Sequence, residues 1–168
     1  MALMAYHPGP AYMRTSRPKA PVIYSTDEVF TIGGLKVLRE SDHDVATVVG
    51  AGVTVFEALK AYDELKAQRT LIRVIDLYSV APVDRDALVK AGRATSGRLI
   101  TVEDHYAAGG LGDAVAEAVA DAALTVRRLA VREIPRSGRP EEMLEHFGIG
   151  AKQIVEEVRA LAGQAAQA

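Results

Sequence analysis

Apolar residues gather into short runs that recur along the chain. Four of these runs are five to eight residues long and are bounded by glycine or polar residues, which predicts strands. They cover 45–49, 71–75, 98–102 and 124–131. A weaker run at 35–38, entered through Gly33 and Gly34, predicts a short strand or hairpin arm.

Between these runs the apolar residues recur three and four positions apart, which predicts amphipathic helices. The predicted helices cover 54–68, 84–94, 112–122, 140–147 and 151–162. Thr54, with Glu57 three positions later, has the form of a capping box, and Asp84 is a suitable N-cap. Strands that alternate with helices of about ten residues favour parallel pairing. The predicted fold class is α/β, a three-layer sandwich with a mainly parallel sheet. The 35–38 run is a candidate for an antiparallel edge strand, which would make the sheet mixed.

The first 21 residues differ from the rest of the chain. They hold four of the seven prolines and the basic residues Arg14, Arg17 and Lys19. Residues 11–16 could form a strand, but no local partner strand is evident. The predicted organisation is a tail or linker of a preceding domain over 1–21, a domain over 22–163 and a flexible tail over 164–168.

Composition excludes several classes of protein. The net charge is −2 and 49% of the residues are apolar, yet no apolar run is long enough to predict a transmembrane helix. The near-neutral charge predicts no nucleic-acid or membrane partner, and the cytoplasm is the expected location. The chain contains no cysteine and no asparagine, so thiolate chemistry and any site that needs an Asn ligand are excluded.

Glu103, Asp104 and His105 follow the predicted strand at 98–102 and are the first candidates for chemistry. They could form an acid/base group or part of a metal site. Consecutive residues at a strand end fan outward, however, which is a poor geometry for binding one metal ion. The favoured interpretation is a polar rim that hydrogen-bonds neighbouring loops or a partner subunit.

Glycines follow two of the predicted strands. Gly109, Gly110 and Gly112 leave N–H groups at a helix start, where an anion could bind, but Asp113 already supplies negative charge and favours simple capping. The Gly-Ala-Gly turn at 50–52 lacks the third glycine of a dinucleotide-binding motif. A tight strand–helix turn is therefore preferred to a nucleotide site.

Arg17 is the best candidate for binding a ligand on charge alone. Pro18 biases Arg17 toward an extended backbone, which would project its guanidinium in a fixed direction suited to a phosphate. Arg14 lies three positions earlier and would face the opposite side of an extended strand, so the two should not act together. An exposed basic tail is the alternative interpretation.

Five segments of the chain, taken in order, resemble transketolase. They are YMRTSRP (12–18), VGAGVTVFEALKA (49–61), RVIDLYSVAPVD (73–84), ITVEDHYAAGGLGDAVAEAV (100–119) and REIPRSGRPEEMLEHFGI (132–149). The resemblance covers the C-terminal domain of that family and the last strand of its middle, pyrimidine-binding domain, to which residues 1–21 would belong. Beta subunits of 2-oxoacid dehydrogenases and deoxyxylulose-phosphate synthase share the domain. The segments at 15–18 and 136–140 favour transketolase over both.

The resemblance implies a thiamine diphosphate enzyme of the pentose phosphate pathway. Such an enzyme moves a two-carbon ketol unit between sugar phosphates, uses a divalent metal (Mg or Ca) and works as a homodimer. In the family, the arginine that matches Arg17 grips the sugar phosphate. No catalytic role of the family carries over to Glu103, Asp104 or His105.

The chain departs from the family pattern where the cofactor binds. The family motif for the diphosphate and metal is Gly-Asp-Gly followed by Asn, and Gly112-Asp113-Ala114 resembles only its start. We therefore expect this chain alone to bind neither thiamine diphosphate nor a metal, and to be inactive without the missing domains. It would be a domain fragment or a small partner of separately encoded domains. A stand-alone interaction or regulatory module, binding a small anion or a partner at the 100–113 rim, is the alternative.

Overall fold

The computed structural model describes residues 2–16 and 19–165 and contains a five-stranded sheet of order β1-β3-β2-β4-β5. The strands are β1 (Lys36–Arg39), β2 (Asp44–Gly50), β3 (Leu71–Asp76), β4 (Arg98–Tyr106) and β5 (Thr125–Val131). The helices are α1 (Ala2–Ala5), α2 (Val53–Ala67), α3 (Arg85–Ala94), α4 (Leu111–Ala118), α5 (Pro140–His146) and α6 (Ala151–Ala165). Strand β1 pairs antiparallel with β3, and the other neighbours pair in parallel. The predicted α/β fold with a mixed, mainly parallel sheet is confirmed.

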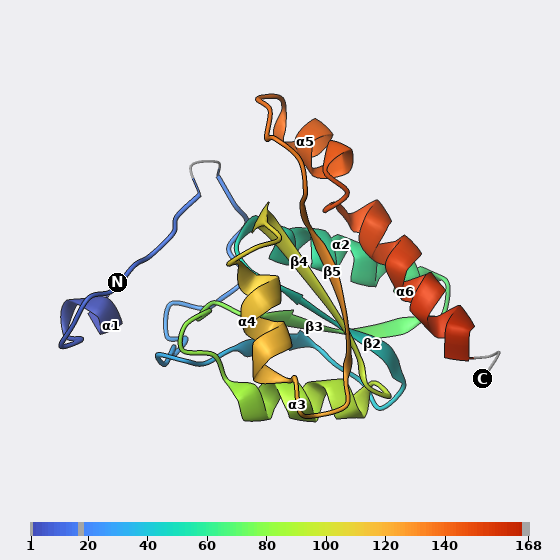
Figure 1. Ribbon diagram of the computed structural model, residues 1–168, viewed down its shortest axis with the longest axis horizontal. Coiled ribbons are helices and arrows are strands. Elements are labelled where there is room, and N and C mark those ends of the chain that lie inside the picture. The colour runs from blue at the N-terminus through green and yellow to red at the C-terminus, as the bar shows by residue number, and fades with distance from the viewer. Residues whose placement is uncertain (1, 17–18, 166–168) are drawn as a thin grey trace.

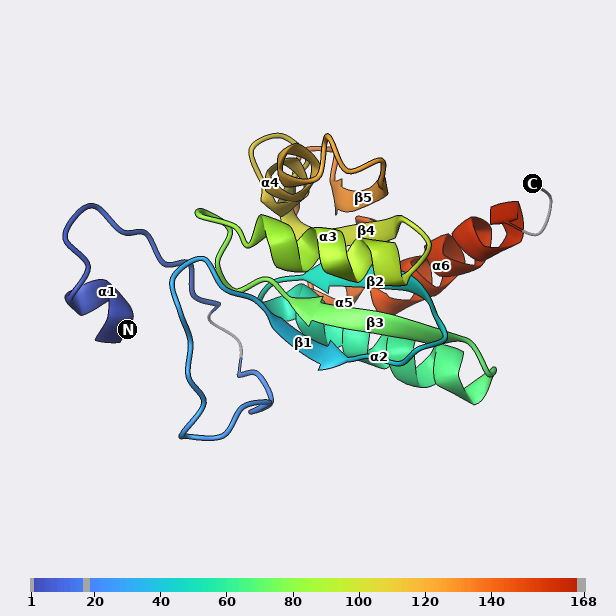
Figure 2. The ribbon, with the colours of Figure 1, turned by 90° about the horizontal axis from the view of Figure 1, so that it is seen from below.

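Helices cover both faces of the sheet, as Figure 2 shows. Helices α2 and α6 pack with the sheet around one apolar cluster, which includes Leu65, Ile100 and Ile154. Helices α3 and α4 pack on the opposite face around a second cluster, which includes Leu88 and Leu99. All five of these side chains are fully buried, and each such burial stabilises the fold by about 1.5–3 kcal/mol. The sheet between two helical layers is the predicted three-layer sandwich.

The predicted capping box at the start of α2 is wrong. Gly52 occupies the N-cap, and the hydroxyl of Thr54 lies 2.8 Å from the Val102 carbonyl oxygen and accepts from the Ala51 N–H at 3.1 Å. The Glu57 carboxylate caps a different helix, because its Oε2 accepts from the Ala151 N–H at the start of α6, at 3.0 Å. The contact between Glu57 and Ala151 could not be predicted from the sequence, because the two residues lie far apart in the chain. The spacing of Thr54 and Glu57 fitted a capping box, but neither side chain caps α2 in this way.

Several other predicted boundaries differ, among them the end of α4, which lies at Ala118 rather than at 122, whereas the cap of α3 agrees. Asp84 accepts from the Ala87 N–H at 3.0 Å, which confirms it as the N-cap. Strand β4 continues through Glu103–Tyr106 rather than ending before Glu103. Residues 11–16 form no strand, since no neighbouring strand offers them backbone partners.

Residues 2–35, of which the structure describes 2–16 and 19–35, form the N-terminal segment, and α1 is its only helix or strand in those ranges. Figure 1 shows α1 lying apart from the sheet, with the chain running back toward β3 and β4. Several apolar side chains of the segment are exposed, among them Tyr6, Tyr12 and Val22. No helix in the described part of the chain is both long and apolar enough to cross a membrane.

Candidate functional site

Polar residues gather where the parallel strands end, and these ends are called the carboxyl edge from here on. It comprises Gly50 at the end of β2, Asp76 at the end of β3 and 103–106 at the end of β4. Helix α2, which follows β2, and α4, which follows β4, pack on opposite faces of the sheet. Open α/β sheets bind ligands at such a switch point. Here the Thr54 hydroxyl at the start of α2 reaches the Val102 carbonyl oxygen on β4.

Glu103 is buried at this edge and fixes the start of α4. Its side chain accepts from the backbone N–H of Gly112, at 3.0 Å from Oε1. Burial raises the pKa of Glu103, while the N–H groups of Gly112 and Leu111 and the charges of His105 and Arg128 act in the lowering direction. Its other oxygen, Oε2, is buried without a hydrogen-bond partner among the described residues. Glu103 is thus a capping carboxylate held under the turn before α4.

The glycines of this turn make room for side chains. A Cβ on Gly112 would lie 2.8 Å from Glu103 Oε1 and 2.5 Å from Arg128 Nε, and one on Gly110 would overlap Glu103 Oε2. Asp113 accepts from the Gly109 N–H and pairs with Arg128 at 2.8 Å. The lowered pKa of Asp113 follows chiefly from the Gly109 hydrogen bond. Two backbone N–H groups of the turn, those of Gly109 and Gly112, are therefore already engaged within the chain.

Asp104 and His105 point to different partners. Both Asp104 oxygens accept from Arg14, each at 2.8 Å, whereas His105 Nδ1 lies 2.9 Å from the Tyr106 carbonyl oxygen. The described residues hold no cluster of three or more histidine and carboxylate side chains that could bind a metal ion. Glu103, Asp104 and His105 thus lie together on β4 without converging, and sequence reasoning missed Arg14 as the partner of Asp104.

A second carboxylate of the carboxyl edge meets the N-terminal segment. Tyr24 donates from its hydroxyl to Asp76 Oδ2 at 2.6 Å. Burial raises the pKa of Asp76, and the Tyr24 hydrogen bond acts in the lowering direction. Burial and the neighbouring Asp76 likewise raise the pKa of Tyr24. Aspartate at a strand end was the available signal for this pair, but nothing in the local sequence pointed to Tyr24.

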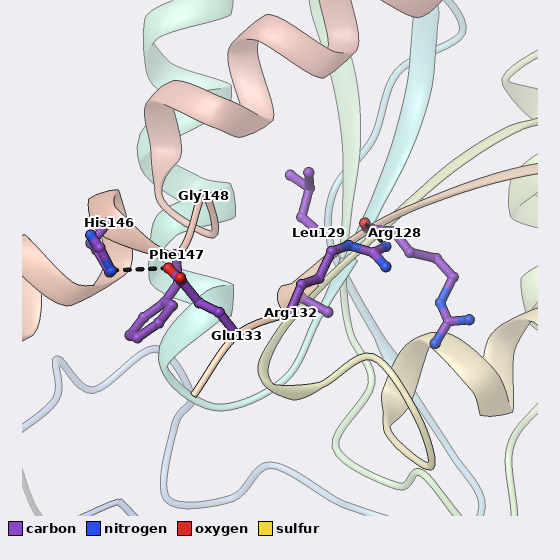
Figure 3. A pocket seen from close by; sticks show the side chains of 8 residues that line it. Arg128, Leu129, Arg132, Glu133, His146, Phe147 and Gly148 are labelled. Atoms are coloured by element: carbon purple, nitrogen blue, oxygen red, sulfur yellow. Dashed lines mark hydrogen bonds and ion pairs between the residues drawn. The ribbon is translucent and has the colours of Figure 1, made fainter. Parts of the chain in front are cut away.

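A hollow of about 360 Å³ lies between β5 and the region of α5. Figure 3 shows that its charged side chains do not converge on one point. His146 pairs with Glu133 at 3.0 Å, Arg132 donates to the Arg128 carbonyl oxygen at 3.2 Å, and the Arg128 guanidinium reaches toward Asp113 on α4. The hollow therefore has the charges of an anion site without the geometry of one.

The residues at Gly112-Asp113-Ala114 do not fit a thiamine diphosphate or metal site. Asp113 lies in the first turn of α4 and is bound to Gly109 and Arg128, and the chain has no asparagine to complete such a donor set. Arg17, the predicted phosphate ligand, lies outside the described residues together with Pro18.

Comparison with known proteins gives a consistent set of matches. The sequence model described as "Transketolase, C-terminal domain" matches residues 33–154. Mouse transketolase-like protein 2 is 49% identical over 94% of this chain, and mouse transketolase is 48% identical over 95% of it. The chain spans about a quarter of each relative, 25% and 26% respectively.

Solved structures agree with these matches. A chain described as a split gene transketolase in an inactive beta4 tetramer superposes with a TM-score of 0.81 at 34% identity. The match covers 88% of the present chain and 48% of that one. A transketolase from Campylobacter jejuni superposes with a TM-score of 0.54 at 17% identity, over 84% of this chain and 20% of its own, which shows a shared fold.

Proposed function

The chain belongs to the transketolase family, whose C-terminal domain it carries, and from this premise we propose that it works as one part of a complete transketolase. The complete enzyme would transfer a two-carbon ketol unit between sugar phosphates. The observation that carries the proposal is the 48% identity to mouse transketolase over 95% of this chain but only 26% of that protein. A chain that aligns along nearly its whole length with one quarter of an enzyme is expected to supply one domain of such an enzyme.

The division of labour follows from the residues present. Thiamine diphosphate and a divalent metal, Mg or Ca, would be held by the domains that this chain does not match, and the cofactor supplies the carbanion chemistry when bound. This chain would supply Arg17, whose planar guanidinium suits a sugar phosphate. It would also supply packing surface, including the Glu103–His105 rim, to the other domains and to the second subunit of a homodimer. A cytoplasmic location and inactivity of the chain alone belong to the same proposal.

The reported relatives favour transketolase over the other enzymes that share this domain. They are transketolases and transketolase-like proteins rather than beta subunits of 2-oxoacid dehydrogenases or deoxyxylulose-phosphate synthase. A stand-alone interaction module gains no support from the carboxyl edge, because the N–H groups of Gly109 and Gly112 bind carboxylates of this chain and Arg128 already pairs with Asp113.

The experiment is a reconstitution. When this chain is titrated with thiamine diphosphate and Mg²⁺ in a calorimeter, we expect no heat of specific binding. Ketol transfer should appear only when the missing domains are present, either fused to this chain or added to it. Arg17→Ala in the complete enzyme should raise KM for a sugar phosphate about tenfold or more, because a charge-assisted hydrogen bond to the phosphate is lost. Lys19→Ala, which removes an exposed positive charge two positions away, is the matched control. Micromolar cofactor binding by this chain alone, or an unchanged KM in Arg17→Ala, would contradict the proposal.

A further inference from the structure

Residues 132–147 stand out from the body of the protein and are called the arm from here on. The arm consists of the loop 132–139, helix α5 and Phe147. Figure 1 shows α5 standing beyond the end of β4. Leu144 and Phe147 pack against the cluster that α2 and α6 share, whereas residues 132–142 are all exposed and α5 has no buried residue. The outer side of the arm is thus left open by the sandwich.

The arm is held in its shape by contacts within this chain. His146 Nε2 lies 3.0 Å from Glu133 Oε1, which joins the start of the arm to its end. The loop lies against α5, since a Cβ on Gly138 would be 2.5 Å from the terminal methyl group of Met143. A surface that is already formed loses less conformational entropy when a partner binds. The arm can therefore meet a partner without refolding.

The two halves of the arm carry opposite charge. The loop holds three arginines and one glutamate, whereas α5 holds three glutamates, and these residues are Arg132, Glu133, Arg136, Arg139, Glu141, Glu142 and Glu145. Arg136, Glu141 and Glu145 are exposed and form no ion pair with any described residue. Glu141 and Glu145 lie four positions apart and so share one face of α5. A basic half beside an acidic half is complementary to a second copy of the same surface turned by 180°.

An exposed apolar side chain and a hollow lie next to each other on the arm. Ile134 is 83% exposed and directly follows Glu133, which lines the hollow of about 360 Å³ beside β5 (Figure 3). Leu129, Ala130 and Phe147 give this hollow an apolar part of its lining. In a two-fold contact each copy offers the same surface, so the isoleucine of each copy can enter the hollow of the other. Its burial would add apolar attraction to the attraction between charges.

We propose that the arm joins two copies of this chain about a two-fold axis. Ile134 of each copy enters the hollow of the other, and Arg136 of each copy lies beside Glu141 and Glu145 of the other. A different protein would need only one of the two charged halves, whereas a second copy uses both at once. The proposal goes beyond the proposed function, because association of this chain depends neither on ketol transfer nor on the missing domains.

Sedimentation velocity of this chain over a range of concentrations tests the charged part of the contact. We expect a reversible monomer–dimer equilibrium with a dissociation constant in the micromolar range. Arg136→Glu should raise that constant about tenfold or more, because it puts an acid opposite Glu141 and Glu145. Lys90→Glu makes the same change of charge at an exposed position of α3, on the other face of the sheet, and should leave the constant unchanged. A parent chain that stays monomeric, or an unchanged constant in Arg136→Glu, would overturn the proposal.

The apolar part of the contact has a matched pair of variants. Ile134→Ser should raise the dissociation constant about tenfold, the effect of losing one buried apolar side chain from each contact. Tyr12→Ser removes an equally exposed apolar side chain from the N-terminal segment and should leave the constant unchanged. Both side chains are exposed in this chain, so neither change should alter the melting temperature. A larger effect of Tyr12→Ser than of Ile134→Ser would move the contact to the N-terminal segment and overturn the proposal.

Mixing two variants tests the two-fold arrangement itself. Arg136→Glu puts acids on both sides of the contact, and Glu141→Arg combined with Glu145→Arg puts bases on both sides, so neither variant should associate with itself. An equimolar mixture restores opposite charges at both halves and should form a heterodimer with a dissociation constant within about threefold of that of the parent. A mixture that stays monomeric would overturn the two-fold contact. Failure of the proposed function would appear instead as absent ketol transfer in the reconstituted enzyme, which these measurements do not use.

Discussion

The central strands and the N-terminal segment meet at the carboxyl edge but are held by different forces. Strands β2 and β4 lie side by side with Val48, Val49 and Ile100 fully buried. The segment leaves Tyr12 and Val22 almost fully exposed, at 88% and 91%. It meets the sheet edge through hydrogen bonds and an ion pair, at Asp104 and Asp76.

This difference separates stability from placement. Burial of large apolar side chains stabilises a fold without regard to direction, whereas partly solvated hydrogen bonds add little stability but fix orientation. The sheet therefore supplies the free energy of folding, and the segment supplies geometry. Exposed apolar side chains on the segment are the surface that the other domains of the proposed enzyme would cover.

The largest effect is expected from emptying the core. Ile100→Ala should lower the free energy of unfolding by about 2–5 kcal/mol, because it leaves a cavity between the sheet and α6. Val22→Ala, in the segment, should change it by less than about 0.5 kcal/mol. Urea denaturation of both variants measures the contrast, and a comparable loss in Val22→Ala would show that the segment is part of the core.

A smaller loss should follow from filling the turn before α4. Gly112→Ala places a methyl group 2.5 Å from Arg128 Nε, and overpacking of this kind costs about 1–3 kcal/mol. Gly163→Ala, in α6, meets no atom within 4 Å and should stabilise the chain by about 0.5–1 kcal/mol, the helix preference of alanine. The melting temperature should fall in Gly112→Ala and rise in Gly163→Ala. An unchanged melting temperature in Gly112→Ala would show that the turn before α4 contributes as little to stability as the N-terminal segment does.

The buried carboxylate of Glu103 should show in the pH dependence of stability. Burial raises the pKa of Glu103 above its value in the unfolded chain, which is about 4.3. The contribution of Glu103 to the free energy of unfolding is therefore fully present below that unfolded pKa and is lost as the pH rises through the folded pKa. The stability of the parent chain minus that of Glu103→Gln should therefore fall as the pH rises from about 4 to 7. Urea denaturation at several pH values tests this.

Asp113→Asn is the matched control for that experiment. The pKa of Asp113 is lowered, first by the Gly109 hydrogen bond, so its stabilisation is lost as the pH falls. The stability difference between parent and Asp113→Asn should rise with pH, opposite to the Glu103→Gln series. If the stability difference changed with pH in the same direction in both series, the conclusion that burial raises the pKa of Glu103 would be contradicted.

The smallest effect is expected in the exposed aromatic residues of the segment. Changing Tyr6 and Tyr12 together to serine should alter the free energy of unfolding by less than about 0.5 kcal/mol, since both side chains are 88% exposed. Chemical denaturation of the double variant checks this. A loss above about 1 kcal/mol would mean that the segment packs on the sheet through apolar contacts, and the contrast between the two regions would not hold.

Local patterns predicted the framework of the molecule. The four apolar runs became β2 to β5, and Asp84 caps α3, because periodicity and capping depend on residues a few positions apart. The contacts of the carboxyl edge escaped prediction for the opposite reason. Asp104 meets Arg14 across 90 positions, and Asp76 meets Tyr24 across 52. Such pairs exist only after the strands have been placed side by side.

The end of β4 shows both outcomes in one stretch. Glycine followed by a helix predicted a close backbone approach, and Gly110 and Gly112 do lie against Glu103 and Arg128. The polar residues after 102 predicted the end of the strand, yet the strand continues through Tyr106 because β5 still offers Val131 as a partner. The charged residues suggested a loop after 102, but pairing with β5 keeps this stretch in the sheet.

The contact between Glu57 and the start of α6 joins two parts of the chain that are synthesised at different times. The carboxylate is made early, in α2, and its N–H partner at Ala151 is added 94 residues later. Until then the apolar face of α2, with Ala58, Ala61 and Leu65, lacks α6 as a cover. A ribosome that stops before α6 would release a chain with an open hydrophobic face, a species prone to aggregation. Helix α6 therefore covers this apolar face of α2 only after the segments from α2 to α5 have been made.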